Sequence, residues 1–385
     1  MTLELSQLTE TVKAMGQEVA LREQTFGQLV KEAQAQLAAC PEPDDALRRA
    51  AKAFGAAIPT AEPVDLSTPL PDLPPRFTVI GADGAQIAPD RHGVALYYLI
   101  NIGSLVYRHG SGERPEARSV ARLRYQQDDV YEGSTLVSGG LLGMRRDRAE
   151  VAELADRAEA EPAGPVLALI DGTLLLWAAD NVPARARETE IASYLAQLDR
   201  LRRRGAAGAA FTSRPQAGDV VRLLHLVAHD GDIDQAGRRP NLLERVPDGA
   251  VFRRLDPGAR SALFISPRSV NQGHYAPAGH EVQFFYVNVA AEDEDPIVAR
   301  VELPAWVAQT PDLLQLVHGG VVAQSRIAGG FPYVLARADE LAYISGPERQ
   351  RLEEMVSTAL LAAGVPPTLS YKALYKSMTR RSGRV

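Results

Sequence analysis

Two aspartates that follow apolar segments are the residues best placed to do chemistry in this chain. Asp83 comes after the apolar segment 77–80, and Asp171 comes directly after the apolar segment 166–170. In open α/β sheets, sites form at the carboxyl ends of strands, so neighbouring strands would bring the two carboxylates face to face. Such a pair repels unless a cation lies between its members. We therefore interpret the two aspartates as ligands of a hard divalent ion, Mn²⁺ or Mg²⁺.

A pair of such ions, roughly 3.5–4 Å apart, stabilises both the attacking and the leaving oxygen in phosphodiester cleavage. The third carboxylate would come from the helix after Met144, where Glu150 and Glu153 are three residues apart and share a face. A structural alternative stays open: Asp-Gly is a common turn sequence, Asp often caps a helix, and an acidic helix face is often simply solvated.

The segment around Asp171 is also similar to the Asp-x-Asp-Gly-Thr motif of haloacid dehalogenase phosphatases. In that motif the first aspartate is the nucleophile, and the chain has Leu169 at this position. Because leucine cannot form an aspartyl-phosphate intermediate, a phosphatase is disfavoured.

The elements that must position these carboxylates indicate a mixed α/β fold. Strands are expected at residues 77–80, 94–102, 118–125 and 166–170, and again at 209–212, 261–265, 282–289 and 297–302. Amphipathic helices are expected at residues 145–160, 188–204, 312–323, 336–344 and 347–363. Strands followed by alternating helices and strands favour a mixed sheet with helices packed on it.

The N-terminal region has a different pattern. Residues 3–38 predict one long helix, with apolar residues at spacings of three and four that make a heptad seam: Leu5, Leu8, Val12, Met15 and Val19, then Phe26, Leu29, Ala33 and Leu37. The seam is typical of a dimer or docking helix and equally of a helix lying on its own core. Residues 41–75 are rich in proline and predict a connector interrupted by a short helix. The expected division is an N-terminal arm and connector at 1–75, a core at 76–346, and a C-terminal helix and basic tail at 347–385.

Composition limits the class of protein. Hydrophobic residues make up 45% of the chain and charged residues 23%, which is ordinary globular usage. No apolar run is long enough for a membrane span, and Cys40, the single cysteine, excludes an intrachain disulfide. We expect a cytoplasmic protein associated with the nucleoid. The net charge of −6 weighs mildly against DNA binding, but local arginine clusters and bound cations can reverse the field at a site.

Several segments, in order, make the chain resemble the NurA nucleases between about residues 76 and 345. The segments are residues 77–86, 98–103, 168–174, 211–215, 299–306 and 330–339. The resemblance implies an RNase H-like fold and a Mn²⁺- or Mg²⁺-dependent nuclease, with two ions, that acts on single-stranded DNA and DNA ends. Such an enzyme is an exonuclease, with endonuclease activity as a further expectation. It also implies a homodimer that works with the hexameric ATPase HerA in DNA-end resection and repair.

Carried over residue by residue, the resemblance makes Asp83 and Asp171 metal ligands, with Glu150 as the third and Glu153 as its alternative. Archaeal members have a tyrosine and a histidine where this chain has Phe331 and Asp339. Phenylalanine stacks on a base but donates no hydrogen bond, whereas Asp339 is able to act as a fourth ligand or a base. The expected DNA-binding residues are Arg146, Arg214, Phe331 and Tyr333. The two departures leave a rival hypothesis open, that of a non-catalytic adaptor that binds DNA or the ATPase.

Overall fold

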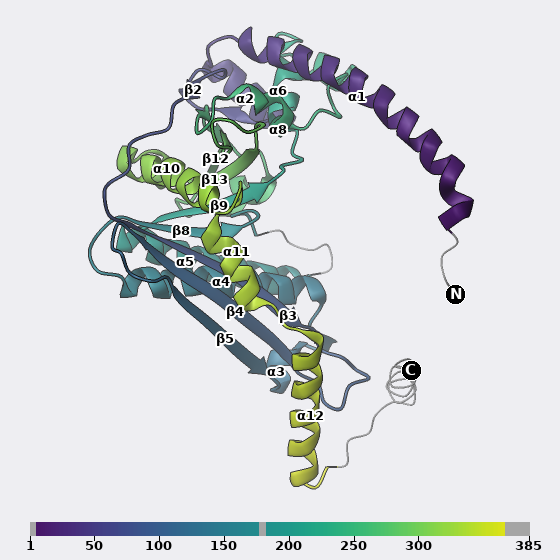
Figure 1. The fold of residues 1–385 in the computed structure, drawn as a ribbon, viewed down its shortest axis with the longest axis vertical. Helices are drawn as coiled ribbons and strands as arrows, with labels where there is room; N and C mark the ends of the chain where they lie inside the picture. The colour runs from purple at the N-terminus through teal and green to yellow at the C-terminus, as the bar shows by residue number, and fades with distance from the viewer. Residues whose placement is uncertain (1–4, 177–181, 366–385) are drawn as a thin grey trace. The chain divides into compact units, whose positions relative to one another are not determined.

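The computed structural model describes residues 5–176 and 182–365, and it divides into two compact units (Figure 1). Unit 1 comprises Met1–Leu73 and Ala210–Phe331, and unit 2 comprises Pro74–Ala209 and Pro332–Val385. The chain therefore leaves unit 1, completes most of unit 2, and returns. The expected division of the chain into residues 1–75, 76–346 and 347–385 stays a prediction.

Unit 2 contains a mixed sheet with the strand order β8-β3-β4-β5. Its strands are β3 (Phe77–Ile87), β4 (Tyr98–His109), β5 (Glu116–Arg124) and β8 (Val166–Asp171). The first three form an antiparallel meander, and β8 returns parallel to β3 after a helical crossover. A meander whose first strand is flanked by a parallel strand confirms the expected mixed α/β, RNase H-like arrangement.

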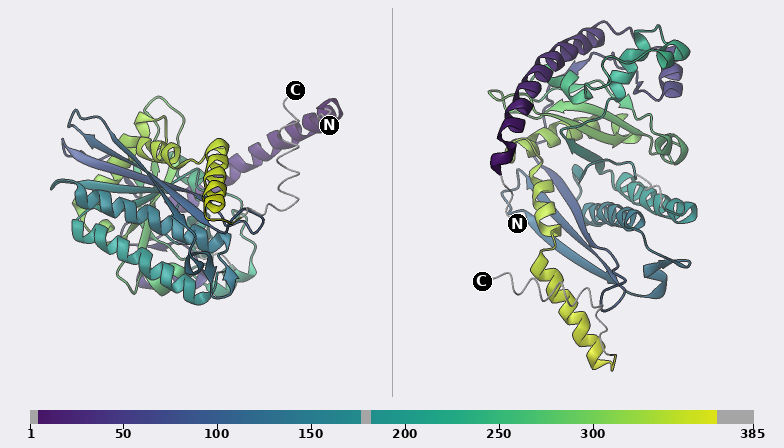
Figure 2. Two further views of the ribbon diagram at one scale, coloured as in Figure 1. Left: turned by 90° about the horizontal axis from the view of Figure 1, so that it is seen from below. Right: turned by 90° about the vertical axis from the view of Figure 1, so that its right-hand side faces the viewer.

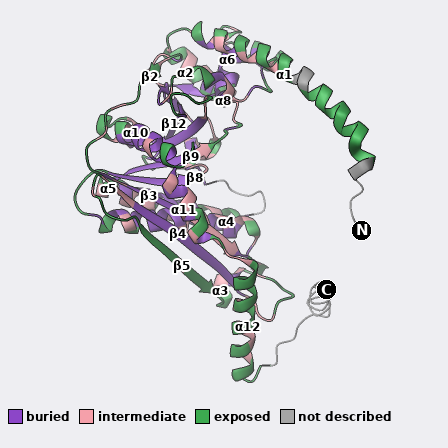
Figure 3. Cartoon of the chain, in the orientation of Figure 1, coloured by how far each residue is buried: buried purple, intermediate pink, exposed green. Residues whose placement is uncertain are grey.

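Helices cover both faces of this sheet. Unit 2 contains α3 (Gln127–Val130), α4 (Gly139–Ala160), α5 (Ala184–Arg204), α11 (Tyr333–Ala342) and α12 (Gly346–Ala362), and a small hairpin of β6 (Tyr131–Glu132) and β7 (Thr135–Leu136). Figure 2 shows α4 and α5 on one side of the strands and α11 on the other. The central strands β3, β4 and β8 are mostly buried, whereas the edge strand β5 is exposed along its length (Figure 3).

Two glycines allow α11 to lie directly on the sheet. A Cβ on Gly81 would stand 2.7 Å from the Val334 carbonyl, and one on Gly103 would stand 2.5 Å from the Ala342 nitrogen. Real Cβ atoms do not approach backbone this closely, so only glycine fits at these two positions. The helix that carries Asp339 is thereby held against β3 and β4.

The strand that carries Asp83 differs from the prediction. We expected a strand that ends in Asp83-Gly84, but β3 continues unbroken to Ile87 and pairs with β4 throughout. Gly84 is therefore a strand residue and not a turn residue. Its lack of a side chain leaves room for Arg146 and Glu150, which pack on it from α4, since a Cβ there would stand 2.7 Å from atoms of both. The second prediction was correct, since β8 ends at Asp171.

Unit 1 is built on a second set of strands. These are β1 (Ile58–Pro59), β2 (Ser67–Thr68), β9 (Ala207–Ser213, whose first three residues belong to unit 2), β10 (Arg260–Ser261), β11 (Phe264–Ile265), β12 (Val282–Asn288) and β13 (Val298–Pro304). Its helical segments are α1 (Thr9–Ala38), α2 (Asp45–Phe54), α6 (Asp219–Val227), α7 (Ile233–Arg238), α8 (Asp248–Val251), α9 (Ala305–Ala308) and α10 (Pro311–Ile327), with short turns at Leu5–Leu8, Phe252–Arg254 and Asn271–Tyr275. Antiparallel pairing joins β12 to β13 and β13 to β9.

The proline-rich segment is more than a connector. β1 pairs with β11 and β2 pairs with β10, so the segment adds two short strands to unit 1. Ile58 and Val64 are buried in the core of this unit, 5% and 2% exposed. Isolated apolar residues between prolines are enough to anchor the segment, a pattern too short to predict.

The long N-terminal helix combines both expected interpretations. In its second half, Ala33 and Leu37 are fully buried in unit 1 and Phe26 and Leu29 pack beside them. In the first half the seam is open, with Leu8, Val12, Met15 and Val19 between 42% and 57% exposed. The helix therefore lies on its own core at one end and presents an unpartnered apolar stripe at the other. In the part of the chain that the structure describes, no helix combines the length and the apolar character needed to cross a membrane.

Candidate metal-dependent nuclease site

The register of two parallel strands places Asp83 beside Asp171. Ala82 on β3 is opposite Ile170 on β8, so the next residue of each strand is one of the two aspartates. Both side chains line a cavity of about 270 Å³ in unit 2. Asp171 ends its strand and is exposed, while Asp83 is half-buried within its strand and accepts a hydrogen bond from the Gly84 N–H at 2.7 Å.

Helix α4 contributes Glu150 to the same cavity. Glu150 is 6% exposed, and its Oε1 atom is buried with no hydrogen-bond partner. Glu153, the alternative on the same helix, points elsewhere, because its Oε1 accepts a hydrogen bond from the Ser104 hydroxyl at 2.8 Å and lies 3.6 Å from Arg118. Of the two glutamates, only Glu150 is brought to the aspartates.

Helix α11 brings a fourth carboxylate from the opposite face of the sheet. The Asp339 side chain is exposed, shares a hydrogen bond with Asp83, and acts electrostatically on Asp171. Asp339 does not line the cavity itself. The four candidate catalytic residues thus come from two strands and from helices on both faces.

The electrostatics of the cavity disfavour negative charge. Burial, with a further contribution from Asp339 and Asp171, raises the pKa of Asp83 from its ordinary value of 3.8 to about 6, against the hydrogen bond from Gly84. Burial also raises the pKa of Glu150 well above its ordinary range, helped by Asp147 and opposed by Arg146. The Asp171 residue is exposed as a whole, but neighbouring protein removes water from its carboxyl group and raises its pKa. A bound cation would reverse each of these penalties.

Among the described residues, Arg146 is the cation that faces these carboxylates. Its Nε lies 3.2 Å from Glu150 Oε1, and its guanidinium also bonds Asp147 Oδ1 at 2.8 Å. One arginine cannot neutralise Asp83, Asp147, Glu150 and Asp171 together. The cluster therefore carries an excess of negative charge.

The chemistry of these carboxylates suits a hard divalent ion. Carboxylate oxygens are the ligands that Mg²⁺ and Mn²⁺ prefer, and Glu150 Oε1, which accepts no hydrogen bond, is available as a ligand atom. Among the described residues, no group of three His, Cys, Asp or Glu side chains is already arranged to hold a metal ion. An ion bound here would compete with Arg146 for Glu150.

A sequence profile of the NurA domain matches residues 77–344, which is more than half of the chain and includes all four carboxylates. The chain belongs to the NurA family. It is therefore a homologue of the NurA nucleases. No individual curated protein matches the sequence.

Solved NurA structures are also similar to this chain. The NurA nuclease from Sulfolobus solfataricus matches at 11% identity over 94% of this chain and 98% of that one, with a TM-score of 0.53. A NurA structure bound to dAMP and manganese matches at 11% identity over 77% of this chain and 90% of that one, with a TM-score of 0.40. At this identity the first match establishes a shared fold with NurA.

The expected DNA-binding residues of this NurA-family chain fall in different places. Arg146 lies in the carboxylate cavity of unit 2. Tyr333, the first residue of α11, packs edge-on against Tyr107 with ring centroids 6.0 Å apart and does not line that cavity. Arg214 and Phe331 belong to unit 1, where both line a separate cavity.

Most other arginine clusters of the NurA-family chain have structural roles. Arg145 and Arg148 on α4 both pair with Glu190 on α5. Arg204 donates to the backbone carbonyls of Ala158 and Pro162. The basic residues of the C-terminal tail, which start at Lys372, lie outside the described residues.

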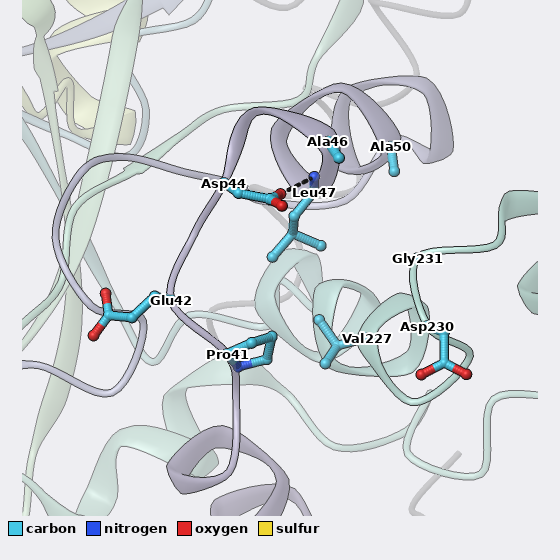
Figure 4. Close-up of a pocket in the computed structure, with 9 residues that line it drawn as sticks. All are labelled: Pro41, Glu42, Asp44, Ala46, Leu47, Ala50, Val227, Asp230 and Gly231. Carbon is cyan, nitrogen blue, oxygen red and sulfur yellow. Dashed lines mark hydrogen bonds between the residues drawn. The ribbon is translucent and has the colours of Figure 1, made fainter.

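A further cavity of about 420 Å³ in unit 1 lies beside α2 and α6 (Figure 4). Its acidic residues are Glu42, Asp44 and Asp230, and Asp44 is turned back to accept a hydrogen bond from the Leu47 N–H at 2.7 Å. Because its described lining has no basic residue, this cavity does not suit a phosphate.

Sequence reasoning missed Asp147. It lines the carboxylate cavity, its pKa is raised by burial, and its charge helps to raise the pKa of Glu150. Its position three residues before Glu150 on the same helix was the available signal, since residues three apart share a face.

Proposed function

We propose that this chain is a divalent-metal-dependent nuclease that hydrolyses phosphodiester bonds of single-stranded DNA and of DNA ends. The observation that carries the proposal is the placement of Asp83, Glu150 and Asp171 on one cavity, with more negative charge than Arg146 neutralises. Carboxylates held together against their own repulsion indicate a cation site. The exonuclease mode expected from the family resemblance is part of the proposal, with endonuclease activity as its extension.

In the proposed mechanism Asp83, Glu150 and Asp171 would hold Mn²⁺ or Mg²⁺, two ions in the full site, and Asp339 would be a fourth ligand. The bound ions would supply an activated water and stabilise the charge on the leaving oxygen. When Glu150 binds the ion, the Arg146 guanidinium would be released from its ion pair with Glu150 and would donate to a phosphate oxygen of the DNA strand. In the protein without ions, Asp83 and Asp339 share a proton through their hydrogen bond, so the four carboxyl groups are not all ionised at once.

The proposed assembly is a homodimer that works with a HerA-type hexameric ATPase in DNA-end resection and repair at the nucleoid. The open stripe of α1 supports a docking role, because Val12 and Met15 are 54% and 57% exposed on a helix whose other end is anchored in unit 1. Apolar heptad positions left in water are stabilised by a second helix. We assign this stripe to the second copy of the chain.

The alternative is a non-catalytic adaptor of the same fold that binds DNA or the ATPase. One observation favours it: among the described residues no three ligating side chains are already arranged around a metal position. The raised pKa values of Asp83, Glu150 and Asp171 favour the nuclease, since an adaptor has no need for a destabilising carboxylate cluster.

The test is the cleavage of end-labelled single-stranded DNA with Mn²⁺, with Mg²⁺ and with EDTA, comparing the wild type with Asp171→Ala. The proposal predicts digestion that requires the ion and is lost in the variant. If the wild type digests DNA neither alone nor with its ATPase partner, the adaptor is the correct function.

A further inference from the structure

A second cavity, in unit 1, carries positive charge in an otherwise acidic chain. It has a volume of about 740 Å³ and is lined by Arg214, Arg253, Phe211 and Phe331, among others. The net charge of the chain is −6, yet no aspartate or glutamate among the described residues lines this cavity. The cavity beside α2 and α6 has the opposite lining, with three carboxylates and no arginine. The contrast indicates an anionic occupant for the cavity lined by Arg214 and Arg253.

The two arginines are available to such an occupant. Arg214 and Arg253 are both exposed, and neither guanidinium pairs with a carboxylate among the described residues. Arg214 has a φ of +47°, a left-handed conformation that costs a residue with a side chain roughly 1 kcal/mol or more. Pro215 follows it and restricts the backbone further. The chain thus holds Arg214 in a strained bend that lines the cavity.

The neighbouring arginine, Arg254, is used differently. Its Nη2 donates to the Asp65 carbonyl at 3.1 Å and so joins the proline-rich segment to the rest of unit 1. Arg254 does not line the cavity. Arg253 lines the cavity and its neighbour Arg254 does not. A substitution of Arg254 is therefore a matched control for the same substitution of Arg253.

Phe331 gives the cavity an aromatic surface. Its ring is half-buried and stands edge-on to Phe211, with centroids 5.5 Å apart and planes at 84°. Gly330, with a φ of +103°, keeps the backbone beside it close to Ile297, whose Cδ1 would stand 2.8 Å from a Cβ at that position. This edge-on packing fixes the Phe331 ring while leaving part of it accessible.

We propose that this cavity is a nucleotide subsite for single-stranded DNA, in which Phe331 stacks on a base and Arg214 and Arg253 bind the flanking phosphates. The proposal rests on the proposed nuclease function and adds Arg253 as a substrate-binding residue. Stacking and phosphate contacts tolerate any base, and the only polar uncharged side chains in the described lining are those of Ser213 and Gln216. The subsite therefore positions the strand without selecting its sequence.

The test is the affinity of the full-length protein for a fluorescein-labelled oligo-dT, measured in EDTA over a series of salt concentrations. Arg253→Ala should weaken binding by roughly 3- to 10-fold and flatten the slope of log K against log salt by about 0.7, the value for one phosphate contact on a single strand. Arg254→Ala should leave the slope unchanged. Phe331→Ala should weaken binding by roughly 5-fold or more without changing the slope, because stacking releases no counterions, and Phe331→Tyr should restore the affinity.

An unchanged affinity and slope in Arg253→Ala would overturn the subsite, as would an equal effect of Arg254→Ala. The same preparations, assayed for cleavage with Mn²⁺, separate the two proposals. Cleavage by the wild type together with unaltered DNA binding in Arg253→Ala rejects the subsite and keeps the nuclease. The expected binding losses together with no cleavage, either alone or with the ATPase partner, keep the subsite and reject the nuclease.

Discussion

Asp83 and Asp171 each stand one residue beyond the Ala82–Ile170 pair of the parallel strands β3 and β8. Parallel pairing brings the two carboxylates to the same edge of the sheet, so their proximity is fixed by the backbone. The remaining parts of the site, Glu150 and Asp339, arrive from helices on opposite faces. The strands therefore fix the positions of two carboxylates, and the helices supply the other two.

The first prediction concerns the stability of the metal-free protein. The pKa of Asp83 is about 6 in the folded protein against an ordinary 3.8, so the folded state binds this proton more tightly than the unfolded state. The stabilisation that this proton provides is complete below about pH 4 and is lost as the pH rises through 6. The variant Asp83→Asn has an amide that cannot ionise, so it avoids that loss. At pH 7.5 in EDTA, we expect Asp83→Asn to be more stable than the wild type by about 1–2 kcal/mol, after allowance for solvent at the site.

Urea unfolding of both proteins between pH 4 and pH 8 checks this prediction. The difference between the variant and the wild type should shrink toward pH 4, and Mn²⁺ should stabilise only the wild type at pH 7.5. A variant less stable than the wild type at every pH would show that the Asp83 charge is not a cost to the fold.

The second prediction concerns the contact between α11 and the sheet. Gly103→Ala would force a Cβ against the Ala342 nitrogen, so we expect it to destabilise unit 2 by about 1–3 kcal/mol. The same change should reduce cleavage, since it moves the helix that carries Asp339. Gly143→Ala on α4 is the control because a Cβ there meets nothing within 4 Å, and alanine favours a helix by up to about 1 kcal/mol. Equal thermal stability of the two variants would contradict the close contact.

The third prediction concerns the open stripe of α1. Val12→Glu combined with Met15→Glu places charges at two exposed heptad positions and leaves the buried residues Ala33 and Leu37 untouched. We expect a dimeric wild type and a monomeric double variant by light scattering, with Mn²⁺ binding preserved in both. A double variant that remains a dimer would remove the stripe from the interface.

The strand and helix pattern of the sequence predicted much of unit 2. The apolar run before Asp171 gave its place at a strand end, and the expected helices α4 and α5 formed, with their first six and first four residues missed. Asp83 was expected at a strand end as well, but Gly84 acts there as space for Glu150 rather than as a turn. A glycine that makes room for a side chain 66 residues later in the chain looks the same in sequence as a turn glycine.

Two features could not be obtained from local pattern. Glu150 and Glu153 share a helix face by spacing and are both buried, and it is tertiary contacts that separate them: Glu153 bonds Ser104 on β4, whereas Glu150 lines the cavity. The joining of residues 1–73 with 210–331 into one unit depends on pairings such as β1 with β11, which join segments about 200 residues apart. Both features depend on contacts between segments far apart in the chain, and such contacts leave no periodic pattern in a single sequence.

The sharpest test of the site compares Glu150→Gln with Glu153→Gln in Mn²⁺-dependent cleavage of single-stranded DNA. Both substitutions neutralise a buried carboxylate on α4, but only Glu150 lines the cavity with Asp83 and Asp171. We expect Glu150→Gln to lower the cleavage rate by about 100-fold or more, as removal of a group that stabilises transition-state charge does, and Glu153→Gln to retain the rate within about threefold. Equal activity of the two variants, or a greater loss in Glu153→Gln, would contradict the assignment of this cavity as the nuclease site.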